Sequence, residues 1–157
     1  MRFPHYLRDR FDHPYRLDFD RSRECWTIRV WDGQLPAAYL YAWHVRGQLL
    51  RIQDFKVADD LVVPEPPLRH LLRQLLRLRP RTLSYRRRGL GTALLATVVA
   101  YADAERIPCL EGDIVERDRA QFPGLPEWYQ ARGFTLRRDA QGLHFHRTLA
   151  MPSTLSA

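Results

Sequence analysis

The residues best suited to carry chemistry form a short basic segment with two glycines, Arg86-Arg87-Arg88-Gly89-Leu90-Gly91, here called the glycine loop. Glycine lets the backbone approach a ligand closely, and a helix that begins there presents free N–H groups and the positive end of its dipole to phosphate oxygens. The arginines add charge-assisted hydrogen bonds. The segment predicts a phosphate site, although a turn followed by a helix cap gives the same pattern.

Two common phosphate loops do not fit this segment. A Walker loop requires Lys-Ser or Lys-Thr after the glycines, and neither dipeptide follows here. A Rossmann fingerprint requires a further glycine at its start and a βαβ context, which is also missing.

The patterns around the glycine loop resemble those of the GNAT superfamily of acyl-CoA-dependent acetyltransferases. The likeness is specific over residues 52–57 and 86–134, and the first strands fit by architecture alone. The matches are Ile52, Phe55 and Val57 to the strand pattern I-x-x-L-x-V, Arg86, Gly89 and Gly91 to the pyrophosphate motif Q/R-x-x-G-x-G/A, and Tyr129, Gly133 and Phe134 to the signature Y-x-x-x-G-F.

The resemblance implies a set of site residues for acetyl-CoA as co-substrate, with no metal. Tyr129 matches the tyrosine that protonates the departing CoA thiolate, although an aromatic residue at such a position is also a common core residue. Glu111 matches the base that some relatives use, with Asp113 and Asp54 as rivals, and each could be an ordinary surface carboxylate. The residues expected at the pantetheine arm and the pyrophosphate are Phe55, Val57, Arg86, Arg87, Arg88, Gly89, Leu90, Gly91 and Thr92.

The periodicity along the chain predicts the elements that would position these residues. An antiparallel meander is expected over residues 15–18, 25–31, 38–45 and 49–57, with turns at 32–33 and 46–48. Helical spacing follows the glycine loop, then a strand at 109–115, a loop with a short helix from Glu127, and a hairpin at 134–148.

The fold class that follows is α+β with an α/β sandwich-like arrangement. The GNAT resemblance implies a mostly antiparallel central sheet of about six to seven strands, splayed central strands and flanking helices. The 157 residues and 45% hydrophobic content fit one domain, residues 1–157, with an inserted helical segment at about 58–84.

The inserted segment departs from the family pattern. The family places two helices that build part of the acceptor pocket between its first two strands, and residues 20–24 leave no room for them. We therefore expect the helix at 66–79 to rebuild the acceptor lid, with its leucines packed on the meander or on a second subunit. Its other face carries Arg69, Arg73 and Arg77. These arginines either form a solvated face or favour an anionic amine acceptor.

The composition leaves two further classes open. The net charge of +7 suits a nucleic-acid-binding module as well as a nucleotide-like co-substrate, but such a module does not require the patterns after the glycine loop. A GNAT-like protein that binds acyl-CoA without turnover is the other alternative. Two cysteines are too few for a disulfide framework, and no signal peptide or membrane span is apparent. The expectation is a cytoplasmic N-acetyltransferase that acts on a primary amine of a small molecule, protein or peptide, with no membrane partner, as a monomer or a homodimer.

Overall fold

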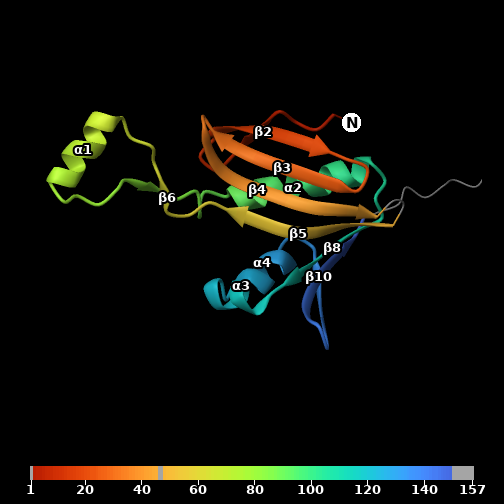
Figure 1. Cartoon of the computed structure of the whole chain (residues 1–157). Helices are drawn as coiled ribbons and strands as arrows, with labels where there is room; N and C mark the ends of the chain where they lie inside the picture. The colour runs from red at the N-terminus through yellow and green to blue at the C-terminus, as the bar shows by residue number, and fades with distance from the viewer. Residues whose placement is uncertain (1, 46–47, 150–157) are drawn as a thin grey trace, which may run out of the picture.

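The computed structural model describes residues 2–45 and 48–149. Its centre is one eight-stranded sheet in the order β1-β2-β3-β4-β5-β8-β10-β9, and helix α2 (Leu90–Ala104) lies behind strands β2 to β5 in Figure 1. The strands of this sheet are β1 (Tyr6–Arg8), β2 (Pro14–Arg21), β3 (Cys25–Asp32), β4 (Leu35–Val45), β5 (Leu49–Val57), β8 (Cys109–Ile114), β9 (Thr135–Asp139) and β10 (Gly142–Thr148).

The α+β class and the mostly antiparallel sheet with flanking helices are confirmed. The sheet has eight strands, one more than the upper bound expected, because the three residues of β1 pair with the start of β2. The tight link between β2 and β3 is confirmed, since Arg21 pairs with Trp26. The turn predicted at residues 46–48 falls on two positions, 46 and 47, that lie outside the described residues.

Alternation along the strands creates the core. In β3, Trp26, Ile28 and Val30 are fully buried, while the residues between them are more exposed, as expected for a strand with one face on a core. Helix α2 covers that face with Leu94 and Val98, which are also fully buried. This packing fixes the start of α2, and therefore the glycine loop, against the sheet.

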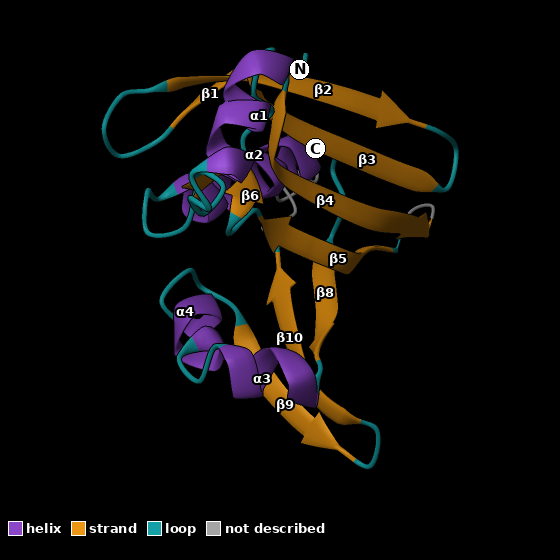
Figure 2. Cartoon of the chain, turned by 60° about the vertical axis from the view of Figure 1, so that its left-hand side comes forward, coloured by secondary structure: helices purple, strands orange, loops and turns teal. Residues whose placement is uncertain are grey.

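The sheet opens between its two central strands. Strands β5 and β8 are the parallel neighbours in an otherwise antiparallel sheet, and they pair only from Leu50 and Leu110 to Ile52 and Gly112. Strand β5 then runs on to Val57 without a partner on that side, and Figure 2 shows β8 diverging from it. The splayed centre is therefore present.

Two short helices follow β8, namely α3 (Glu116–Gln121) and α4 (Leu125–Gln130). The sequence predicted a loop over residues 120–126 and a helix only from Glu127, and it gave no signal for α3. Helix α4 starts two residues earlier because Pro126 stands in its first turn, where a missing N–H removes no intrahelical hydrogen bond.

The inserted segment forms an arm, defined here as residues 58–84, that projects from the body of the molecule (Figure 1). Strands β6 (Leu61–Val62) and β7 (Thr82–Leu83) pair at its base, and helix α1 (Pro67–Leu75) lies at its far end. The side chains expected to pack on the meander are 56–79% exposed, so that expectation is wrong; they are Leu68, Leu71, Leu72, Leu75 and Leu76. The alternative, a second subunit on this face, stays a prediction.

Candidate active site

A cleft of about 1190 Å³ occupies the splay between β5 and β8. The start of α2 and the residues of α3 and α4 complete its walls. The site residues predicted from sequence that line it are Phe55, Val57, Arg86, Arg87, Gly89, Leu90, Gly91, Thr92 and Tyr129. Residues far apart in the chain are thus brought to one cavity.

The glycine loop has the backbone shape that a close approach requires. Gly89 caps α2 with a left-handed φ of 79°, and Arg87 also has a positive φ of 58°. No side chain caps the helix, so the N–H groups of its first turn are available to a ligand. A Cβ on Gly91 would lie 3.3 Å from Val57 Cγ2 and 3.5 Å from Phe55 Cζ. The glycine thereby lets α2 begin directly against β5.

The three loop arginines do not behave alike. The Arg86 guanidinium pairs with Asp59, at 3.1 Å from Nε to Oδ2, and stacks over the Phe122 ring. The Arg88 Nε lies 2.7 Å from Oδ2 of the fully buried Asp9 carboxylate. Arg87 is exposed at the cleft wall. Arg88 is not among the cleft residues, and its part in phosphate binding stays a prediction.

Tyr129 is held by aromatic packing. The residue is 5% exposed, and its ring stacks on Phe145 with centroids 4.0 Å apart and planes 11° from parallel, while the Phe134 ring meets it edge-on with centroids 5.6 Å apart. Burial, with a smaller effect of the Asp118 charge, raises the pKa of the Tyr129 phenol well above its ordinary value. The hydroxyl therefore remains protonated at neutral pH, as a proton donor must.

The three candidate carboxylates lie in different settings. Glu111 accepts a hydrogen bond from Arg51 at 3.3 Å and is not among the cleft residues, whereas Asp54 and Asp113 are. Burial acts to raise the pKa of Asp113, but hydrogen bonds from Arg51 and His144 hold that pKa below its ordinary value. Asp113 is therefore a weak proton acceptor.

Asp54 has a different partner. Its Oδ2 accepts a hydrogen bond of 2.5 Å from the Tyr39 hydroxyl, which raises the pKa of Tyr39 to about 12. Both residues line the cleft. Among residues 2–45 and 48–149, no group of histidine, cysteine and carboxylate side chains has the arrangement of a metal site.

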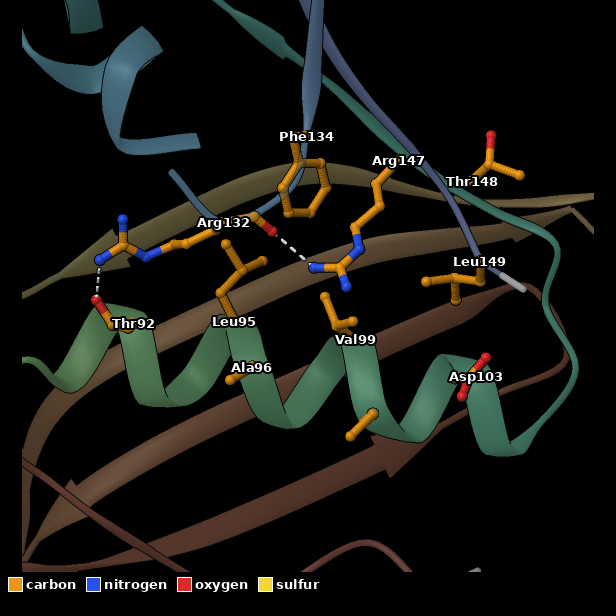
Figure 3. Close-up of a pocket in the computed structure, with 11 residues that line it drawn as sticks. Thr92, Leu95, Ala96, Val99, Asp103, Arg132, Phe134, Arg147, Thr148 and Leu149 are labelled. Atoms are coloured by element: carbon orange, nitrogen blue, oxygen red, sulfur yellow. Dashed lines mark hydrogen bonds between the residues drawn. The ribbon is translucent and has the colours of Figure 1, made fainter. Parts of the chain in front are cut away.

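A second, smaller pocket of about 550 Å³ lies between α2 and β10 (Figure 3). Here the Arg132 Nη2 donates to Thr92 Oγ1 at 2.6 Å, and the Arg147 Nη1 donates to the Arg132 carbonyl at 2.7 Å. Arg132 Nη1 also donates to the Trp128 carbonyl at 2.6 Å. These hydrogen bonds connect the first turn of α2 to the end of α4 and therefore fix the position of the glycine loop relative to Tyr129.

Sequence reasoning placed the acceptor lid in the arm, and this expectation is wrong. No described residue of α1 lines the cleft, and Figure 1 shows the helix well away from the splay. Arg69 and Arg77 are exposed, Arg77 beyond the end of α1, while Arg73 is half-buried and pairs with Glu65 within the arm, so none of the three faces the cleft. Residues of α3 and the segment after it form the cleft wall instead, including Arg117 and Phe122.

Sequence reasoning also missed Arg10 and Trp128 at the cleft. Trp128 precedes the matched tyrosine and could have been added as its neighbour. Arg10 reaches the cleft from the loop between β1 and β2, and its contact with a segment almost eighty residues later left no local signal in the sequence.

Comparisons with known proteins identify the fold to which this geometry belongs. No family model matches the chain, and no curated protein matches it by sequence. Solved structures do match. The ribosomal-protein-S18-alanine N-acetyltransferase of Escherichia coli aligns over 87% of this chain and 77% of its own, with 16% identity and a TM-score of 0.56. The chain has the GNAT fold.

Two further GNAT-fold structures agree with this assignment. A GNAT-family acetyltransferase of Staphylococcus aureus aligns over 80% of this chain and 69% of its own, with 11% identity and a TM-score of 0.56. The PaiA N-acetyltransferase of Thermoplasma acidophilum, solved in complex with coenzyme A, aligns over 80% of this chain and 61% of its own, with 9% identity and a TM-score of 0.53. At such identities the likeness establishes the fold alone.

None of the described helices is long and apolar enough to span a membrane.

Proposed function

We propose that this protein is an acyl-CoA-dependent N-acetyltransferase that transfers the acetyl group of acetyl-CoA to a primary amine. One observation carries the proposal: a basic glycine loop at a helix start and a buried, protonated tyrosine line the same cleft, where two central strands separate. The first suits a pyrophosphate and the second suits a leaving thiolate. The coenzyme A bound to the Thermoplasma protein of the same fold supports this reading.

In this proposal the backbone does most of the binding. The unpaired edge of β5 at Phe55 and Val57 offers N–H and C=O groups to the amides of the pantetheine arm. The N–H groups from Arg87 to Thr92 and the side chain of Arg87 hold the pyrophosphate. The thioester then lies in the splay, within the cleft that Tyr129 lines.

The reaction moves two protons. The neutral amine attacks the thioester carbonyl, the C–S bond breaks, and Tyr129 gives its phenolic proton to the departing thiolate. The amine must lose a proton, and the cleft favours Asp54 over Glu111 and Asp113 for this role. Glu111 is ion-paired with Arg51 and is not among the cleft residues, and Asp113 is bound by Arg51 and His144.

The test is an acetylation assay that follows CoA release with a thiol reagent against a panel of amines, peptides and proteins. Tyr129→Phe removes one hydroxyl and little volume, so it should keep the acetyl-CoA Kd and lower kcat by roughly 10² to 10⁴. Asp54→Asn should lower kcat more than Glu111→Gln. A Tyr129→Phe enzyme with the wild-type kcat would show that another group protonates the thiolate. Binding without turnover on any acceptor would favour a non-catalytic acyl-CoA-binding protein.

A further inference from the structure

The loop between β1 and β2 packs on the glycine loop. The Arg10 N–H donates to the Arg88 carbonyl at 3.0 Å, and a Cβ on Gly89 would lie 3.3 Å from Arg10 Cβ. The chain thus brings the Arg10 backbone against the turn that leads into α2, where Gly89 and Leu90 line the cleft. The Arg10 side chain is exposed and lines the cleft, with its guanidinium over the ring of Phe11.

A buried carboxylate holds this contact in place. Among the described residues, Asp9 is the one charged residue that is buried. Its carboxylate oxygens accept hydrogen bonds from the N–H groups of Phe11 and His13, at 2.9 and 3.1 Å, and from the Tyr15 hydroxyl at 2.9 Å. Its fourth partner is Arg88 of the glycine loop. Burial alone would raise the pKa of Asp9, but these hydrogen bonds and the Arg88 charge hold that pKa below its ordinary value. The carboxylate therefore stays ionised and keeps both loops together.

Ion pairs within the protein determine which arginines near the cleft are free to bind a phosphate. Arg86 and Arg88 each have a carboxylate partner, Asp59 and Asp9. For Arg10, no carboxylate lies within ion-pair distance in the part of the chain that is described. Phosphate binding by Arg10 therefore breaks no ion pair, whereas Arg86 or Arg88 would have to give up its carboxylate partner.

We propose that Arg10 is a phosphate ligand of the CoA site, and that Arg88 is a positioning residue that holds Arg10 there through Asp9. This inference rests on the proposed function, since the phosphates are those of CoA. Two phosphate sources are possible within that molecule, the pyrophosphate and the 3′-phosphate, and both present the same oxygens to a guanidinium.

The first test measures CoA and 3′-dephospho-CoA binding by calorimetry for wild type, Arg10→Gln and Arg8→Gln. Arg8→Gln is the matched control because it removes one positive charge from the same region. Unlike Arg10, Arg8 pairs with Asp12 and does not line the cleft. Arg10→Gln should raise the CoA Kd by about tenfold to a hundredfold, the range for one charge-assisted hydrogen bond to an ionised group. Arg8→Gln should stay within about twofold of wild type.

The two ligands separate the phosphate sources. A loss for both ligands assigns Arg10 to the pyrophosphate, and a loss for CoA alone assigns it to the 3′-phosphate. If wild type binds CoA and Arg10→Gln binds it equally well, this inference fails while the proposed function stands. If wild type does not bind CoA, both fail.

The second test asks whether Arg88 positions Arg10 or binds a phosphate directly. Arg88→Gln should raise the CoA Kd in the wild-type background and should add nothing in the Arg10→Gln background. The same factor in both backgrounds would make Arg88 an independent ligand and overturn its positioning role. If Arg88→Gln does not fold because Asp9 is left unpaired, the pair Asp9→Asn with Arg88→Gln removes both charges and is compared in the same two backgrounds.

Discussion

Gly112 offers a direct test of how the splayed strands hold Tyr129. It stands on β8 at the last position that pairs with β5, opposite Phe145 on β10. A Cβ at this position would lie 2.3 Å from Phe145 Cζ and 2.8 Å from the Ile52 carbonyl oxygen. The carbonyl belongs to the neighbouring strand and cannot rotate away, so Gly112→Ala must push β5 and β8 apart and displace the Phe145 ring.

The expected magnitude follows from these contacts. Overpacking of a well-filled core costs about 1 to 3 kcal/mol, and for a chain of this size each kcal/mol lowers Tm by about 2 to 4 °C. Gly112→Ala should therefore lower Tm by about 2 to 12 °C. Phe145 stacks on Tyr129, so the displaced ring moves the hydroxyl, and an ångström of misplacement can cost about a hundredfold in rate.

Thermal unfolding and acetylation kinetics on the acceptor found in the amine panel measure both effects. The matched control is Gly124→Ala, because a Cβ there meets no atom within 4 Å and the backbone φ is −83°. Its Tm should stay within about 2 °C of wild type. Adding Phe145→Leu to Gly112→Ala should recover part of the lost Tm but not kcat, since the stack on Tyr129 is gone. A Gly112→Ala protein with wild-type Tm and kcat would refute the packing argument.

Three further predictions concern the rest of the molecule. Gly89→Val should abolish CoA binding measured by calorimetry, because Gly89 has a φ of 79° and its Cβ would face Arg10 at 3.3 Å; unchanged affinity in a folded variant would remove the glycine loop from the site. Changing the row Arg69, Arg73 and Arg77 together to glutamine should leave the acceptor KM and the acetyl-CoA Kd unchanged in steady-state kinetics, because the arm lies away from the cleft; a raised KM would restore its role in acceptor choice. His144 should make stability fall as the pH rises. Hydrogen bonds to Asp139 and Asp113 raise its pKa, so its contribution is full below the ordinary pKa of about 6.5 and is lost as the pH passes the raised value. Tm measured across that range should lose this slope in His144→Gln, and an identical slope in both proteins would contradict the assignment.

The site was predictable where its signal was local. The glycine loop and the segment from Tyr129 to Phe134 each combine residue type and spacing within a few positions, and both line or border the cleft. What the sequence did not reveal depends on contacts between distant segments. Arg88 is paired with Asp9, so a count of adjacent arginines overstated the cations at the cleft.

The fold predictions failed where the sequence carries no local signal. Strand β1 has three residues, and β6 and β7 have two each, which is too short for alternation to be visible. The leucine spacing predicted a helix over residues 66–79, and a helix does form there, but it ends at Leu75. Amphipathic spacing also does not say what the apolar face meets. In this structure the face is exposed, and the arm leaves the acceptor side of the cleft to other residues.

The most direct test of the central claim, that the cleft is an acyl-CoA site, is a thermal-shift titration of the wild-type chain with acetyl-CoA. A ligand that binds only the folded state stabilises it by about 2.7 kcal/mol at a hundred times its Kd, which corresponds to a rise in Tm of about 5 to 11 °C. We predict a saturable rise of this size. A melting curve that does not move at any concentration of acetyl-CoA would contradict the account.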